Sequence, residues 1–291
     1  MDKLKTPPLF AVIGGSGLYE INGMENIQEQ SLETPFGKPS APIISGTLNG
    51  HRVAFLSRHG DGHKFNPSAV NYRANIYALK MLGVRKVISV NACGSLREDY
   101  QPGDIVVPNQ IYDHTKNRDY TFFEQGITAH VSTADPFCGE LSKNLIQALQ
   151  KTDASIHPQG GFVIIEGPRF STRLESNTFR SWGMSIIGMT TAPEAFLARE
   201  AELCYASLAH ITDYDAWHTG EDPVSVNMVL QILEKNLDTV KKTLTALVDI
   251  LAAETEVCKC ESALEGTIIT RPEAVDTSVK KKLELILSKY I

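Results

Sequence analysis

Long apolar runs are missing from this sequence of 291 residues, and so is an excess of positive charge. No stretch is apolar for long enough to cross a bilayer, and the first eight residues lack the apolar core of a signal peptide. The formal charge of −6 at pH 7 disfavours nonspecific binding to nucleic acid or anionic membranes, because both repel an acidic surface. We therefore expect a cytoplasmic protein without nucleic-acid or membrane partners.

Cysteine is scarce, and its count is odd. The five residues are Cys93, Cys138, Cys204, Cys258 and Cys260. Such a set favours free thiols in a reducing compartment over the disulfide framework of a secreted protein. Cys258 and Cys260 form a local pair, but zinc normally requires four ligands, and we cannot assemble four from the sequence nearby. We therefore expect no metal site and unliganded thiols in the tail.

Alternating strand and helix patterns run along the chain, without a low-complexity linker or a repeat. Hydrophobic residues make up 42% and charged residues 21% of the sequence, which is ordinary for an enzyme with a packed core. The length is sufficient for one large α/β domain. Asn49-Gly50 lies between two apolar runs and predicts a β-hairpin. The pattern as a whole predicts an α/β fold.

The stretch from Ile186 to Asp215 is the centre of the predicted site. Two short apolar runs flank an alanine-rich segment with helical spacing, which predicts a β-α-β unit with parallel strands. Met189 and Thr190 follow the first strand, and Asp213 follows the second. Parallel strands end at one edge of a sheet, and ligands bind outside those ends. A hydroxyl at a helix start, an apolar side chain and two carboxylates suit a ligand with a flat polar ring and an anionic group.

Three further turns at strand ends carry groups suited to an anion. The turn at 14–18 is rich in glycine, but it has neither the lysine of a P-loop nor the third glycine of the dinucleotide fingerprint. A second turn holds Arg58 and His59 among glycines, where the hairpin ends. A third turn, 91–95, follows a buried strand. Because charge is concentrated where the fold places ligands, we expect Arg58 and His59 to bind an oxyanion and not to form a solvated loop.

Short motifs in consistent order, from about Phe10 to the early 250s, resemble the trimeric purine nucleoside phosphorylase superfamily, and most closely its branch of 5′-methylthioadenosine phosphorylases. The motifs are GGSGL (14–18), TPFG (34–37), RHG (58–60), NYRAN (71–75), ACGSL (92–96), PGD (102–104), EGPRF (166–170) and GMT (188–190). The resemblance implies a single domain over 1–255, with a central mixed, largely parallel twisted sheet flanked by helices. Residues 256–291 would form a C-terminal extension with a terminal helix, and its paired cysteines look similar to those of some thermophilic members.

The resemblance also implies the role of individual residues. Phosphate would be bound by Ser16, Arg58, His59, Asn91, Ala92 and Thr190. The nucleoside would be bound by Phe170, Ser171, Ile187, Met189, Asp213, Asp215, Val226, Val229 and Leu230, and by His130 of a neighbouring subunit. Asp213 and Asp215 would be the catalytic residues. Phosphate would be a co-substrate, with no cofactor and no metal, and the protein would be a trimer or a dimer of trimers.

Two positions bear on the choice of base. Phosphorylases for 6-oxopurines carry glutamate and asparagine where this chain has Ser171 and Asp213. A carboxylate accepts the 6-amino hydrogens of adenine or, when protonated, donates to N7, and it repels a 6-oxo group. Val226 and Val229 lie on one predicted helical face that suits a methylthio group. The resemblance therefore implies phosphorolysis of 5′-methylthioadenosine to adenine and 5-methylthioribose-1-phosphate.

Several alternatives stay open on the sequence alone. The protein could be a 6-oxopurine phosphorylase, a dinucleotide-binding oxidoreductase, or a nucleoside-binding protein without catalytic activity. Asp213 and Asp215 could cap a loop if each had a local backbone partner. Phe170 and Met189 could pack in the core, and His130 could be an ordinary surface residue.

Overall fold

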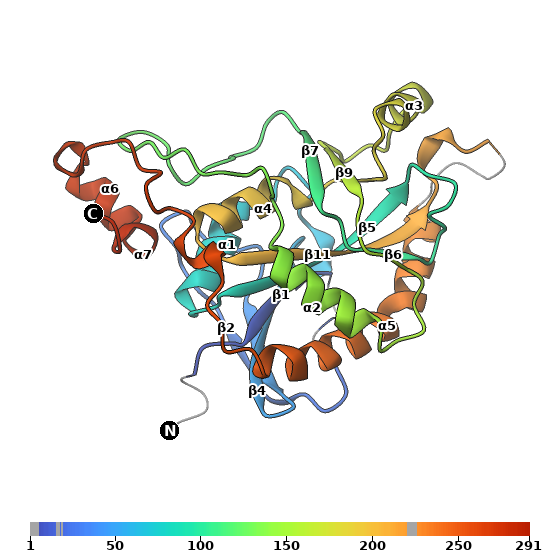
Figure 1. Cartoon of the computed structure of the whole chain (residues 1–291), viewed down its shortest axis with the longest axis horizontal. Coiled ribbons are helices and arrows are strands. Elements are labelled where there is room, and N and C mark those ends of the chain that lie inside the picture. Colours follow the sequence, from blue (N-terminus) through green and yellow to red (C-terminus); the bar gives the residue numbers. More distant parts are fainter. Residues whose placement is uncertain (1–5, 16–17, 19, 220–225) are drawn as a thin grey trace.

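The computed structural model of the chain describes residues 6–15, 18, 20–219 and 226–291. Eleven strands of this part form one sheet with helices on both faces (Figure 1). The strands are β1 (Phe10–Gly14), β2 (Glu25–Gln30), β3 (Ile43–Leu48), β4 (His51–Ser57), β5 (Lys86–Ser95), β6 (Ile105–Val106), β7 (Gln110–His114), β8 (Ile156–His157), β9 (Gly161–Ile165), β10 (Ile186–Gly188) and β11 (Cys204–Asp213). The helices are α1 (Tyr72–Met81), α2 (Gly139–Leu149), α3 (Arg173–Ser181), α4 (Thr191–Glu200), α5 (Val226–Ala252), α6 (Thr277–Lys282) and α7 (Glu284–Leu287).

The sheet is mixed and largely parallel, as predicted. Its main strand order is β2-β3-β4-β1-β5-β10-β9-β7, and β11 pairs with β5 and β6, while β8 pairs with β6. The pairs β1–β4, β1–β5, β5–β11, β9–β10 and β7–β9 are parallel. Every residue of β1 and β11 is buried, which is typical of parallel strands covered on both faces.

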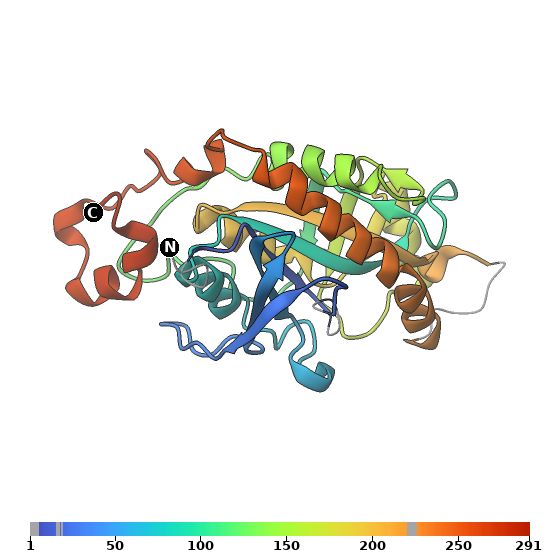
Figure 2. The ribbon, with the colours of Figure 1, turned by 90° about the horizontal axis from the view of Figure 1, so that it is seen from below.

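The two faces of the sheet are covered by different helices, as the view in Figure 2 shows. Ala11 and Ile13 of β1 join one buried cluster, to which α1 and α4 contribute. Phe10 and Val12 point the other way and join a cluster with α2 and α5. This alternation follows from the two-residue repeat of a strand. None of the described helices combines the length and the apolar composition that crossing a bilayer requires.

The predicted hairpin is confirmed. Leu48 of β3 pairs with His51 of β4, and the turn residues Asn49 and Gly50 have φ values of 47° and 79°. Asparagine and glycine tolerate this left-handed backbone, which matches the twist of the two strands. The turn therefore fixed the register of this pair from local sequence.

The predicted parallel β-α-β unit is wrong in one respect. β11 runs parallel to β5, but β10 runs antiparallel to β5, so the two strands that flank α4 point in opposite directions. β10 belongs to a second parallel group with β9 and β7. The direction of β10 is set by its pairing with β5 and β9. A local sequence pattern carries no information on such pairing.

The tail does not form the single terminal helix that the sequence predicts. Two short helices, α6 and α7, meet at Leu283, whose backbone (φ −107°, ψ 13°) interrupts the helix. Val275, Leu283 and Ile286 are buried in the same cluster as α1 and α4. The tail therefore shares the main core, and a boundary near residue 255 stays a prediction.

The burial of His210 in β11 predicts a pH-dependent stability. Burial lowers the pKa of His210 to about 4, whereas an exposed histidine titrates near pH 6.5. The unfolded chain therefore binds a proton that the folded chain does not bind between these values. The free energy of unfolding should fall by up to about 3 kcal/mol as the pH drops from 6.5 to 4. Urea unfolding of wild type and His210→Leu at several pH values between 6.5 and 4 measures this change. If the free energy of unfolding fell equally steeply with pH in both proteins, His210 would not be its cause.

Candidate active site

The ends of β5, β10 and β11 meet around Gly94. Ile187 of β10 and Asp213 of β11 both pair with Gly94 of β5. A Cβ atom at position 94 would lie 2.9 Å from Asp213 Oδ1 and 3.1 Å from Ile187 Cγ2, so only glycine allows this approach. The segments carrying Met189 and Asp213 therefore come together, as predicted, although the strands that deliver them are antiparallel.

A buried ion pair lies beneath this edge of the sheet. Arg58 Nε donates to Glu194 Oε2 at 2.7 Å, and Nη2 donates to Glu194 Oε1 at 2.8 Å. Arg58 is 3% exposed and Glu194 is fully buried. Burial by itself would lower the pKa of Arg58, but the Glu194 carboxylate more than offsets this effect, and the pKa is raised. No sequence pattern indicates a role for Glu194, because nothing local marks the partner of a distant arginine.

Further contacts use most of the remaining donors of Arg58. Nη1 donates to Val90 O at 3.1 Å, and Nη2 also lies within hydrogen-bond distance of Ile13 O and Ser89 Oγ. A guanidinium has five N–H groups, and the described contacts leave one on Nη1. The expectation that Arg58 binds phosphate stays a prediction, and this N–H and the positive charge are what Arg58 offers to an anion.

The Thr190 hydroxyl is oriented by Asn91. Asn91 Nδ2 donates to Thr190 Oγ1 at 2.8 Å, and Asn91 Oδ1 accepts from Ser207 Oγ at 2.9 Å. Because Thr190 Oγ1 accepts here, its own proton is available to a ligand. Thr190 directly precedes α4, which is interrupted at Ala192 (φ −105°, ψ 134°), so the regular helix begins after this residue. Ala92, the next residue after Asn91, is partly exposed in β5.

His59 is neutral at pH 7. Its Nδ1 donates to Phe65 O at 2.8 Å, and its ring stacks on His63 at 4.3 Å between centroids. Burial, together with the Arg58 charge, lowers the pKa of His59 to about 4. Since Nδ1 carries the proton, Nε2 is an acceptor in this state, and a neighbouring phosphate would favour protonation of Nε2.

The two carboxylates predicted to be catalytic are both buried. Asp213 Oδ1 accepts from the amide of Asp215 at 2.8 Å, and Oδ2 accepts from Thr212 Oγ1 at 2.7 Å. Asp213 thus has the local backbone partner that a loop cap requires, and this contact also fixes the orientation of its carboxylate. Asp215 has a positive φ of 49°, and burial raises its pKa.

Unsatisfied polar atoms lie close to Asp215. Ser171 Oγ, Ser176 Oγ and Asp215 Oδ2 are buried and make no hydrogen bond of good geometry within the described part of the chain. The two hydroxyls are still near enough to offset part of the rise in the Asp215 pKa. Phe170, next to Ser171, is 40% exposed. Buried polar atoms without partners beside an exposed aromatic ring are typical of a ligand site.

Arg118 is a residue of the candidate site that no sequence motif indicated. It is 7% exposed, and its guanidinium donates to Met189 O at 2.8 Å and to Glu166 O at 2.8 Å. These bonds tie the end of β10 to the end of β9 and hold Met189 in place. Arg118 lies in a loop without a periodic pattern, so no local signal was available to find it.

The side chains of the other predicted residues that the structure describes make no polar contact with the groups above or lie away from them. Ile187 is 4% exposed and packs in a small cluster with Phe179. His130 is exposed, and its amide donates to Thr267 O in the tail. The loop around His130 and the tail lie at the opposite end of β11 from Asp213 (Figure 1). Ser16 is not among the described residues, and the side chains of Val226, Val229 and Leu230 are not described.

The fold and this edge of the sheet define a phosphorylase, and the family model described as the phosphorylase superfamily matches residues 9–249. An S-methyl-5′-thioadenosine phosphorylase from Koribacter versatilis (strain Ellin345) is 48% identical over 279 residues, covering 96% of this chain and 95% of that protein. One from Hyperthermus butylicus (strain DSM 5456 / JCM 9403 / PLM1-5) is 52% identical over 262 residues, covering 89% and 95%. The chain therefore belongs to the family of S-methyl-5′-thioadenosine phosphorylases within this superfamily.

Solved structures agree with this assignment. The crystal structure of a methylthioadenosine phosphorylase from an antarctic soil metagenomic library has a TM-score of 0.93 at 46% identity, covering 97% of this chain and 99% of that chain. A mutant adenosine/methylthioadenosine phosphorylase from Schistosoma mansoni, in complex with methylthioadenosine, has a TM-score of 0.79 at 36% identity, covering 96% and 97%.

The buried ion pair predicts a specific pattern of stability. Arg58→Ala leaves the Glu194 carboxylate buried without a counter-charge, and should lower the free energy of unfolding by about 3–5 kcal/mol. The double variant Arg58→Met with Glu194→Leu removes both charges and should recover most of this loss. Urea unfolding of wild type, Arg58→Ala and the double variant measures these free energies. If Arg58→Ala were as stable as wild type, the ion pair would not stabilise the fold.

Proposed function

We propose that this protein catalyses the phosphorolysis of 5′-methylthioadenosine, which gives adenine and 5-methylthioribose-1-phosphate. The observation that carries the proposal is the pairing of Gly94 with both Ile187 and Asp213, which brings the segment after β10, with the Thr190 hydroxyl, to the same sheet edge as a buried carboxylate. Membership of the family and the complexes of its Schistosoma mansoni relatives with adenine and methylthioadenosine support the substrate.

In the proposed mechanism, phosphate is a co-substrate and the nucleophile. Arg58, His59 and Thr190 orient it below the ribose. A phosphate oxygen forms a bond to the anomeric carbon as the bond to the purine nitrogen breaks, through an oxocarbenium-like transition state. The electron pair of the broken bond goes to the purine. Positioning of the reactants and a fixed electrostatic environment supply the rate enhancement, and the reaction requires no cofactor to balance.

Asp213 is the proposed partner of the base. Its carboxyl group, fixed by Asp215 N and Thr212 Oγ1, would accept from the 6-amino group of adenine or, when protonated, donate its proton to N7 of the departing purine. Ser171 and Asp215 would add polar contacts to the base, with Phe170 packed beside it and Met189 beneath the ribose. A carboxylate at position 213 disfavours a 6-oxo group, and this favours adenine over hypoxanthine or guanine.

The proposal predicts that adenine release requires phosphate and Asp213. Wild type should release adenine from methylthioadenosine only when phosphate is present. Asp213→Asn should reduce turnover by about 10²–10⁴, the usual contribution of a positioned acid or base, and should narrow discrimination against inosine. Asp238→Asn, an exposed change on α5, is the control and should match wild type. Release without phosphate would contradict phosphorolysis, and tight binding without turnover would favour a binding protein.

We further propose that the chain assembles as a trimer or a dimer of trimers in the cytoplasm. Tyr112 on β7 and Trp182 after α3 are 41% and 49% exposed, and their rings meet edge to face at 5.5 Å. Exposed aromatic side chains at one edge of the sheet are typical of an interface. Because His130 lies away from Asp213 in the same chain, its predicted role requires a neighbouring subunit.

The assembly can be tested by light scattering. Wild type should have the mass of three or six chains, and Trp182→Glu should reduce both this mass and activity, because a buried charge opposes association. Ile27→Glu on β2, at the other edge of the sheet and 57% exposed, is the matched control and should change neither. A fully active monomer would contradict the proposal.

A further inference from the structure

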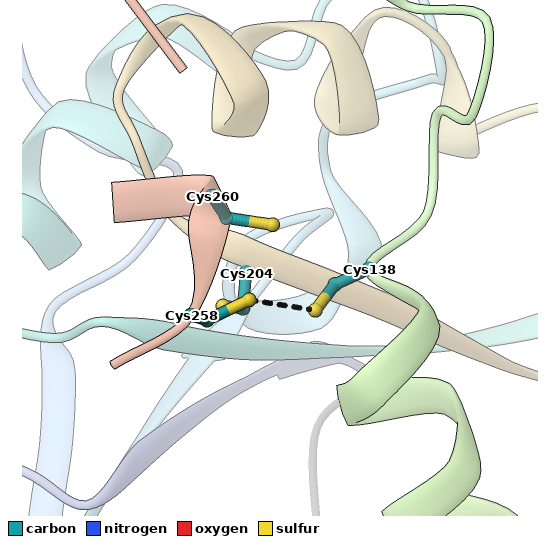
Figure 3. Close-up of side chains that lie close together, drawn as sticks. All are labelled: Cys138, Cys204, Cys258 and Cys260. Carbon is teal, nitrogen blue, oxygen red and sulfur yellow. Dashed lines mark hydrogen bonds between the residues drawn. The ribbon is translucent and has the colours of Figure 1, made fainter. Parts of the chain in front are cut away.

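Four of the five cysteines come together at one point of the fold, although the sequence places them in separate segments. Cys138 directly precedes α2, Cys204 is the first residue of β11, and Cys258 and Cys260 lie in the tail beyond α5. Figure 3 shows the four side chains gathered, with their sulfur atoms near one another. The expectation that four ligands cannot be assembled around the tail pair is therefore wrong.

The spacing of the sulfur atoms suits a metal ion. All four Sγ atoms lie within 4.8 Å of one another, and Cys138 Sγ is 3.6 Å from Cys258 Sγ. A tetrahedral zinc site with Zn–S bonds of about 2.3 Å places its sulfur atoms about 3.8 Å apart. A disulfide requires only about 2.0 Å, and all five cysteines are free thiols. The sulfur atoms are thus arranged as ligands around one centre.

The surroundings provide positive charge for thiolates. Arg199 Nη1 donates to Cys260 Sγ at 3.3 Å, and Nη2 of the same side chain donates to Asp135 O, which fixes its orientation. The amide of Leu141 donates to Cys138 Sγ at 3.4 Å, at the start of α2. Four thiolates around a divalent cation leave a net charge of −2, and such hydrogen bonds and a helix start stabilise it.

The four cysteines differ in their exposure to solvent. Cys138, Cys204 and Cys260 are 3%, 1% and 4% exposed, whereas Cys258 is partly exposed and offers a route to solvent. The cluster and Asp213 lie at opposite ends of the ten-residue strand β11, a separation of about 30 Å at 3.3 Å per residue. The cluster is therefore separate from the proposed catalytic carboxylate of the same chain.

We propose that Cys138, Cys204, Cys258 and Cys260 bind one Zn²⁺ ion in a tetrahedral site of four thiolates. Soft sulfur ligands select zinc over the oxygen-binding cations, and four protein ligands leave no open position for catalysis. Binding converts four thiols to thiolates and releases up to four protons to solvent. The site fastens the tail, and with it α6 and α7, to α2 and β11 of the core.

The full-length chain, purified under reducing conditions, tests this proposal. Mass spectrometry of the metal content should find one zinc per chain. After removal by a chelator, Co²⁺ should restore the sulfur-to-metal absorption of a tetrahedral thiolate site in the same ratio. Cys258→Ser, chosen because Cys258 is partly exposed, should abolish this stoichiometric spectrum. Lys259→Ala, an exposed change between the two tail cysteines, should keep it.

A second variant separates metal binding from folding. Arg199→Gln keeps all four thiols and should weaken Co²⁺ binding by about 10–100-fold, as expected for loss of a group that supports a ligand. If Cys258→Ser fails to fold, the titration of wild type and Arg199→Gln decides the question alone. Folded wild type that takes up neither Zn²⁺ nor Co²⁺, or disulfides among these cysteines in the reduced preparation, would overturn the proposal.

Discussion

The buried pair of Arg58 and Glu194 is the interaction on which this edge of the sheet depends. Removing two charges from water is costly, and the structure offsets the cost by giving nearly every donor and acceptor a partner. Arg58 follows β4 and bonds to carbonyls of β1 and β5, while Glu194 lies in α4 and also accepts from Tyr205 Oη at 2.8 Å in β11. One ion pair thus connects four strands and a helix beneath the proposed phosphate site.

Polar contacts extend from this pair to the site itself. Ser89 lies within hydrogen-bond distance of both Glu194 and Asn91, and Asn91 orients the Thr190 hydroxyl. A hydroxyl held in this way needs no reorganisation when an anion binds, which is the physical basis of electrostatic catalysis. Arg118 holds Met189 in place by a separate hydrogen bond, from its guanidinium to Met189 O. The rigidity of the site therefore comes from charged side chains buried below it.

β11 connects the two proposed sites. Its final residue, Asp213, is placed by pairing with Gly94, and its first residue, Cys204, is a ligand of the proposed zinc site. The strand is buried along its whole length, so both ends are held by the same core. The tail packs on α1 and α4, far from the carboxylate of the same chain. The proposed zinc site and the proposed active site thus lie at opposite ends of one strand.

The sequence by itself determined the features that depend on neighbouring residues. The Asn49-Gly50 turn set the hairpin, apolar runs marked the buried strands, and motifs at strand ends indicated the family and the residues proposed for the site. Only the tertiary structure decided the direction of β10, the partners Glu194 and Arg118, and the meeting of Cys138 and Cys204 with the tail. Each of these joins segments separated by tens of residues, and local patterns carry no information on contacts at that range. Such contacts are fixed by packing of the whole sheet and its helices.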